Sequence, residues 1–207
     1  SIMDYFFNNF FIMAVLYSCG ETVKKVEDRA ENATEINPES KEKTVAKTAD
    51  NSTYLCKING EEWGYTSADG LVSRNSSTNV RTATITFIKK LAKGSESVQL
   101  EYDVDANTLT RVLAELKRPD KEGNLFTNFY NQSADRLDRN PKASMSGSIT
   151  LSEDQRVAAG NALFTVQNDF EKDKLGNASD LLITISDLNF SGVPYSDTDD
   201  LKKLFKK

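Results

Sequence analysis

Residues 82–88 read Thr82-Ala83-Thr84-Ile85-Thr86-Phe87-Ile88, a run rich in β-branched residues in which threonine alternates with apolar side chains over the first six positions. Period-two alternation predicts a strand with one face in a core. Residues 98–104, Val98-Gln99-Leu100-Glu101-Tyr102-Asp103-Val104, repeat the alternation after a break at Lys93-Gly94. Two such segments separated by a short turn predict neighbouring antiparallel strands.

The same pattern extends toward the N-terminus. Leu55-Cys56-Lys57-Ile58 alternates and is followed by Asn59-Gly60, the residue pair that favours a tight hairpin turn. Glu62-Trp63-Gly64-Tyr65 is then expected to be the returning strand. Asp69-Gly70 predicts another turn, because both residue types are common in turns. The folded domain is therefore expected to begin at Thr53 and to cover residues 53–207.

Further strand-like segments continue to the C-terminal end, and a short helix is expected over residues 199–207. The segments are 125–130, 144–151, 162–167 and 181–190. About eight short strands separated by turns predict a mainly β fold, an antiparallel β-sandwich or barrel.

One segment, residues 109–117, fits two structures. Its apolar residues recur at helical spacing, at Leu109, Val112, Leu113 and Leu116. Read as a strand, it would instead pair with residues 98–104 through a turn at Asp105-Ala106-Asn107. The strand is favoured because the flanking segments form a meander, and the helix remains the alternative.

The N-terminal region is typical of a bacterial lipoprotein signal. The apolar run from Tyr5 to Tyr17 is 13 residues long, whereas a membrane-spanning helix needs about 20. It ends at Leu16-Tyr17-Ser18-Cys19, with a small residue, Ser18, before a cysteine. We expect cleavage after Ser18 and lipidation of Cys19, with a buried N-terminal element or a true membrane span as the alternatives.

Between the predicted signal segment (1–18) and the domain lies a charged segment, residues 19–52. It has few large apolar side chains, so it cannot bury enough surface to fold alone. Val23, Val26, Ala30 and Ala33 lie at helical spacing. We expect a helical or disordered tether.

Composition restricts the chemistry. The chain has no histidine, which excludes Ser-His-Asp and Cys-His catalysis and histidine-ligated metals. The net charge of −5 disfavours a nucleic-acid partner. With only Cys19 and Cys56 as thiols, no metal or other cofactor is expected, and Cys56 is expected to be a buried, inert thiol unless it forms a disulfide with Cys19.

Aromatic residues supply the candidate ligand-binding positions, Trp63, Tyr65 and Tyr130. Each fits core packing or stacking on a ligand. Asp103-Val104-Asp105-Ala106-Asn107 begins like a calcium loop but lacks the later glycine and glutamate, so a turn is the better interpretation. The sequence offers no catalytic residues.

The signal, the tether and Lys57-Ile58-Asn59-Gly60-Glu61-Glu62-Trp63 together resemble small lipoproteins of Bacteroidota-type bacteria. In those proteins a hairpin with this pattern opens a β-sandwich domain of unknown function. Residues 160–166 and 183–194 resemble the closing strands of such domains. The resemblance implies a β-rich fold and an envelope location.

These features predict a non-catalytic envelope protein of the binding or accessory type. Fatty chains such as palmitate on Cys19 would hold it at the bacterial outer membrane or cell surface. The partner is expected to be a glycan, a peptide or another envelope protein. Two alternatives remain: a carboxylate-dependent hydrolase of envelope glycans, and a structural envelope protein.

Overall fold

A computed structural model describes residues 51–205 of the chain. The predictions for the signal segment 1–18, for Ser18 and Cys19, and for the tether up to residue 50 lie outside the described residues. The described part is mainly β, as the alternation predicts, and forms one open sheet of ten strands.

The strands are longer and more numerous than the sequence pattern indicated. They are β1 (Thr53–Ile58), β2 (Glu61–Tyr65), β3 (Ser67–Arg74), β4 (Arg81–Lys90), β5 (Ser95–Asp103), β6 (Thr108–Pro119), β7 (Leu125–Ser133), β8 (Ser144–Ser152), β9 (Val157–Gln167) and β10 (Leu182–Asp197). Two 3₁₀ helices, η1 (Ala134–Arg139) and η2 (Ala178–Asp180), and a terminal helix α1 (Thr198–Leu204) complete the fold.

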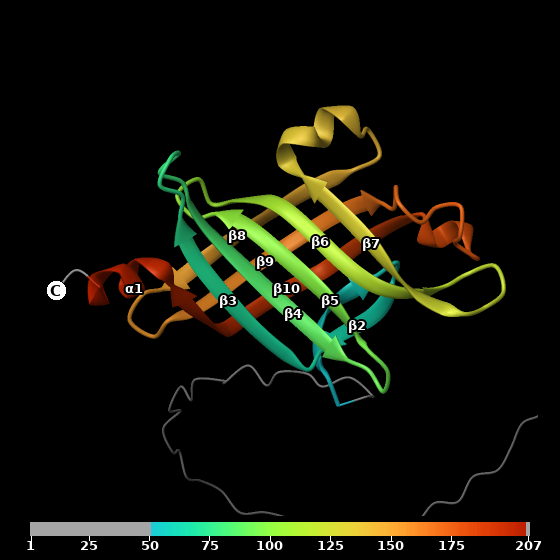
Figure 1. Cartoon of the computed structure of the whole chain (residues 1–207), viewed down its shortest axis with the longest axis horizontal. Coiled ribbons are helices and arrows are strands. Elements are labelled where there is room, and N and C mark those ends of the chain that lie inside the picture. Colours follow the sequence, from blue (N-terminus) through green and yellow to red (C-terminus); the bar gives the residue numbers. More distant parts are fainter. Residues whose placement is uncertain (1–50, 206–207) are drawn as a thin grey trace, which may run out of the picture. The chain divides into compact units, whose positions relative to one another are not determined.

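The sheet folds over on itself into two layers (Figure 1). The strand order is β2-β1-β10-β3-β4-β5-β6-β7, and β8 and β9 extend from β10. The strands β3 to β7 form one layer, while β8, β9 and most of β10 form the other (Figure 1). β6 lies against β8.

β10 connects the layers. Residues 182–194 pair antiparallel with β9, whereas Tyr195, Ser196 and Asp197 pair parallel with Gly70, Leu71 and Val72 of β3. This is the one parallel pairing among the described strands. The sequence predicted an antiparallel β-sandwich or barrel, and the structure is one open, folded sheet whose two layers are joined by β10.

The Asn59-Gly60 hairpin is confirmed, with φ values of 50° and 85° and with Ile58 paired to Glu61. The turn predicted at Asp69-Gly70 is wrong, because both residues lie within β3. A Cβ on Gly70 would come within 2.9 Å of the side chains of Ile85 and Tyr195. Gly70 therefore serves close packing of the strands and not a turn.

The strand interpretation of residues 109–117 is confirmed by β6. Its register against β5 shifts, so that Glu101 faces Arg111 while Tyr102 faces Leu109. This bulge adds one residue, Thr110, whose hydroxyl donates to the Glu101 carbonyl at 3.0 Å. Because of the inserted residue, the buried side chains Leu109 and Val112 are three positions apart, whereas buried residues in a regular strand are two apart. A spacing of three is also found on one face of a helix, so the sequence fitted both structures.

The core lies between the layers. Tyr102 of β5 and Phe87 of β4 place their rings 6.4 and 5.4 Å from the ring of Phe190 on β10. The Tyr102 hydroxyl also donates to the Asn161 carbonyl of β9 at 2.9 Å. Cys56 is fully buried in the same core.

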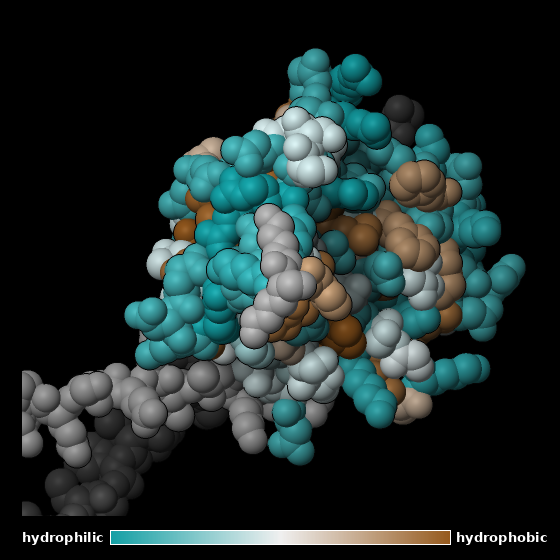
Figure 2. Space-filling model, turned by 60° about the vertical axis from the view of Figure 1, so that its left-hand side comes forward, coloured by the Kyte–Doolittle hydropathy of each residue, from teal (hydrophilic) through white to brown (hydrophobic). Residues whose placement is uncertain are grey.

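The C-terminal helix α1 is tied to the sheet by its capping residue. The Asp197 carboxylate accepts a hydrogen bond from the backbone N–H of Asp199 at 2.9 Å and from Arg81 at 2.8 Å. Apolar patches interrupt an otherwise hydrophilic surface (Figure 2). Within residues 51–205, no helix has the length and hydrophobicity needed to cross a bilayer.

Candidate ligand-binding groove

Trp63, the first candidate residue, lies in the core with 5% of its surface exposed. Its Nε1 donates a 3.2 Å hydrogen bond to the buried Glu96 carboxylate on β5. Both the ring and its polar atom are thus engaged inside the domain.

Tyr130 and Tyr65 also face inward. Tyr130 is fully buried, and its hydroxyl donates to the Asp180 carbonyl at 2.6 Å. Tyr65 is half-buried, with its ring centroid 5.1 Å from that of Phe87. The structure therefore does not bring the three candidate aromatics together on a surface, and packing accounts for each.

A groove of about 680 Å³ lies elsewhere, at the end of the sheet where η1 follows β7. The 3₁₀ helix stands above the ends of β6 and β7 (Figure 1). The lining side chains are almost all polar, and they come from β6, β7, η1 and the region where β9 ends. They are Arg111, Asn131, Gln132, Ser133, Asp135, Arg136, Arg139, Asn140, Gln167, Asp169 and Phe170.

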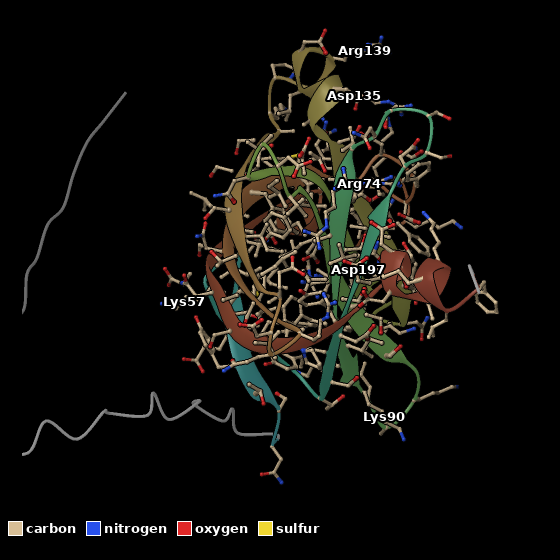
Figure 3. The ribbon with its side chains drawn as sticks, turned by 90° about the vertical axis from the view of Figure 1, so that its left-hand side faces the viewer. Lys57, Arg74, Lys90, Asp135, Arg139 and Asp197 are labelled. Carbon is tan, nitrogen blue, oxygen red and sulfur yellow. The ribbon has the colours of Figure 1, made fainter. Side chains whose placement is uncertain are left out.

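The geometry of η1 directs Arg136 and Arg139 to one side. In a 3₁₀ helix, residues three apart eclipse each other because a turn contains three residues. Both arginines are exposed. Figure 3 shows Arg139 and Asp135 on η1, at the opposite end of the domain from Lys90. The two guanidinium groups therefore belong to one face of the groove.

The positive charges of Arg136 and Arg139 act on the carboxyl group of Asp135. A hydrogen bond with Ser133 is the main factor that lowers the pKa of the Asp135 carboxyl, and the charges of Arg136 and Arg139 lower it further. The carboxylate is therefore ionised at neutral pH and offsets part of the positive charge.

The groove has a fixed polar base. Gln132 is buried, donates from Nε2 to the Ser133 carbonyl at 2.9 Å, and accepts from Asn140 Nδ2 at 3.2 Å. On β6, Arg111 donates from Nε to Asn131 Oδ1 at 3.1 Å, which leaves its terminal nitrogens available. These contacts hold amide and guanidinium groups in set orientations.

Phe170 is the aromatic residue of the groove and is 76% exposed. Its position follows from Asn168, a fully buried side chain at the end of β9. Asn168 Oδ1 accepts from the backbone N–H groups of Phe170 and Glu171 at 3.1 and 2.9 Å, while Nδ2 donates to Asn128 at 3.0 Å. A buried amide thus fixes the turn that presents an exposed ring.

In two other hollows of the described domain, positive side chains lie beside negative ones. One of about 390 Å³ includes Arg118, whose Nε lies 3.2 Å from the Asp180 carboxylate. Another, of about 450 Å³, is bordered by Asp120, Glu122, Lys121 and Lys174. This second hollow is lined by both positive and negative side chains. Neither hollow therefore offers a surplus of unpaired cations.

In the part of the chain that the structure describes, no group of three His, Cys, Asp or Glu residues lies close enough together to bind a metal ion. The Asp103–Asn107 segment forms a turn, in which Asp103 Oδ1 accepts from the Ala106 N–H at 2.9 Å. Asn107 Oδ1 accepts from the Ile149 N–H at 2.7 Å and so joins this turn to β8.

The sequence did not reveal the groove, because none of the candidate residues lies in η1 and Phe170 was not among them. A signal was present in Arg136-Leu137-Asp138-Arg139, where two arginines stand three residues apart. Arg111 and Gln167 come from distant strands, and no local pattern connects them with η1.

Comparison with family models, curated proteins and solved structures found no match to this chain.

Proposed function

We propose that this chain is a lipid-anchored envelope protein that binds a glycan in the groove beside η1, without catalysis. The observation that carries the proposal is the joint presence in the groove of planar polar side chains and one exposed aromatic ring.

Sugars suit such a lining. Amide side chains present a donor beside an acceptor, and arginine presents paired donors, which match the neighbouring hydroxyls of a pyranose ring. The apolar C–H face of a sugar can pack on a ring such as Phe170, which has little contact with its own domain. The volume of about 680 Å³ lies within the usual range for a small-molecule site.

Binding is favoured over the alternative of glycoside hydrolysis. A glycosidase needs a general acid whose pKa is raised, opposite a second carboxylate. The carboxylates that line the groove are Asp135 and Asp169. The Ser133 hydrogen bond and the adjacent arginines lower the pKa of Asp135, which is the wrong direction for an acid catalyst.

The anchor is the second half of the proposal. Its support is the sequence Leu16-Tyr17-Ser18-Cys19 after an apolar run, together with the resemblance to Bacteroidota-type lipoproteins. Acyl chains on Cys19 would attach the polypeptide firmly, since each buried methylene contributes about 0.8 kcal/mol. The expected location is the bacterial outer membrane or cell surface.

Binding is tested by titrating the full chain with envelope oligosaccharides in isothermal calorimetry. Phe170→Ala should weaken binding at least tenfold, while the matched control Phe205→Ala, which alters an 85% exposed ring outside the groove lining, should leave it unchanged. Turnover of the oligosaccharide would favour the hydrolase. No binding together with a stable oligomer in light scattering would favour the structural alternative.

The anchor is tested by mass spectrometry of the mature N-terminus. We expect a chain that begins at Cys19 and carries acyl groups, and we expect Cys19→Ala to abolish processing and to release the protein from membranes. An unprocessed N-terminus in the wild type would refute the anchor and leave the groove proposal standing.

A further inference from the structure

We propose that the glycan bound in the groove is acidic, with its carboxylate or phosphate group held by Arg136 and Arg139. This inference depends on the proposed function, because it names the chemical class of the same ligand.

The arginines of the described domain differ in whether they have a carboxylate partner, and this difference is what supports an acidic ligand. The described part of the chain contains seven arginines. Four of them, away from the groove, have a carboxylate within 4.0 Å. They are Arg74, Arg81, Arg118 and Arg156.

The other three, Arg111, Arg136 and Arg139, all line the groove. Among residues 51–205, none of these three has a carboxylate within 4.0 Å, although the charges of Arg136 and Arg139 act on the carboxyl of Asp135. The chain has more acids than bases, 31 against 26, so partners are not scarce. Unpaired guanidinium groups concentrated in one concave site are thus a local feature of that site.

The arrangement of donors suits an oxyanion. A guanidinium group presents its N–H donors in a planar fork that matches carboxylate or phosphate oxygens. Because Arg136 and Arg139 are eclipsed on η1, two forks approach from one side. Arg111 adds a third from β6, where its Nε is already held by Asn131.

The two groove carboxylates, Asp135 and Asp169, leave a net local charge of about +1 when the three arginines are counted. This modest surplus favours one acidic group at a time and not a polyanion such as nucleic acid, which needs a broad basic surface. Phe170 and the amides remain available for the neutral part of the sugar.

The inference is tested by titrating the full chain with three oligosaccharides of equal length: one that carries uronic acid carboxylates, one that carries phosphate, and one that is neutral. An acidic ligand should bind at least tenfold tighter than the neutral one in dilute buffer. The advantage should shrink in 0.5 M NaCl, where exposed charges are screened. The stronger of the two acidic ligands identifies which oxyanion the site takes.

Arg136→Gln/Arg139→Gln should abolish the preference, so that the variant binds the acidic oligosaccharides no more tightly than it binds the neutral one. The matched control, Lys202→Gln/Lys203→Gln, removes the same charge from α1 and should keep the preference. Trp63 fluorescence during thermal unfolding checks that each variant is folded.

The possible failures separate the two proposals. Equal binding of all three oligosaccharides, or a preference that survives in Arg136→Gln/Arg139→Gln, would overturn the acidic ligand and leave glycan binding intact. Binding of none of them would instead overturn the proposed function.

Discussion

The indole Nε1 of Trp63 donates a hydrogen bond of 3.2 Å to the Glu96 carboxylate, and both residues are buried. The second Glu96 oxygen accepts from the Lys117 N–H at 2.8 Å. The same oxygen lies 3.8 Å from Arg118. One carboxylate therefore connects the opening hairpin with β5 and β6.

Removing that carboxylate should destabilise the domain. Glu96→Ala leaves the Trp63 and Lys117 donors without a partner, and we expect a loss of roughly 2–4 kcal/mol in the free energy of unfolding. Urea denaturation followed by the emission of Trp63, the single tryptophan of the chain, measures it. The exposed Glu62→Ala on β2 is the control, and an equal loss there would contradict the role of Glu96.

Cys56 should resist thiol reagents in the folded protein. Burial raises the pKa of its thiol to about 12, and the side chain has no exposed surface. In a Cys19→Ala background, we expect less than a tenth of molecules to react with iodoacetamide in native buffer at pH 8, and complete reaction in 6 M guanidinium. Rapid native labelling would show that the site is accessible.

Acid should weaken the contact between β10 and β4. Burial on its own raises the pKa of Asp197, but hydrogen bonds from Arg81 and from the Asp199 N–H outweigh it, so the pKa lies below the usual 3.8. A lowered folded-state pKa means that the contribution to stability is complete above the unfolded pKa of about 3.9 and is lost as pH falls through the folded value.

The test is a pair of stability curves between pH 7 and pH 2. Asp197→Asn should cost roughly 1–3 kcal/mol at pH 7, and its difference from wild type should shrink below pH 4. The exposed Asp154→Asn should cost little at pH 7. A constant difference between wild type and Asp197→Asn across the range would show that the Asp197 charge is not responsible.

Gly70→Ala should destabilise the joint between the layers. The added methyl would lie 2.9 Å from Ile85 and from Tyr195, which belong to opposite neighbouring strands. Overpacking of this kind costs about 1–3 kcal/mol. Thermal unfolding measures the loss, and Ser67→Ala, at an exposed position of the same strand, should stay within about 0.5 kcal/mol of wild type.

Much of the fold could be predicted because side-chain alternation is a local signal. Residues 82–88 lie within β4, all but the last of residues 98–104 lie within β5, and Asn59-Gly60 makes its hairpin. One ambiguity and one wrong prediction have physical causes. The bulge at Thr110 disguised the period of β6, and Gly70 was interpreted by residue type although its neighbours come from distant strands.

The groove could not be predicted, since its parts meet only after folding. Arg111 and Arg139 are 28 positions apart, and Phe170 is supplied from beyond β9. Trp63 and Tyr130 drew attention because aromatic residues are common in binding sites. Their partners Glu96 and Asp180 lie too far along the chain to be recognised from the sequence.

The crossover of β10 has a consequence for biosynthesis. β10 pairs with β1, β9 and β3, and it follows all three in the chain. Before residues 182–197 leave the ribosome, the β8–β9 hairpin and the β1–β2 hairpin lack the strand that attaches them to the β3–β7 meander. The pairings that join the two layers therefore cannot form until residues 182–197 have been synthesised, however early the hairpins themselves form.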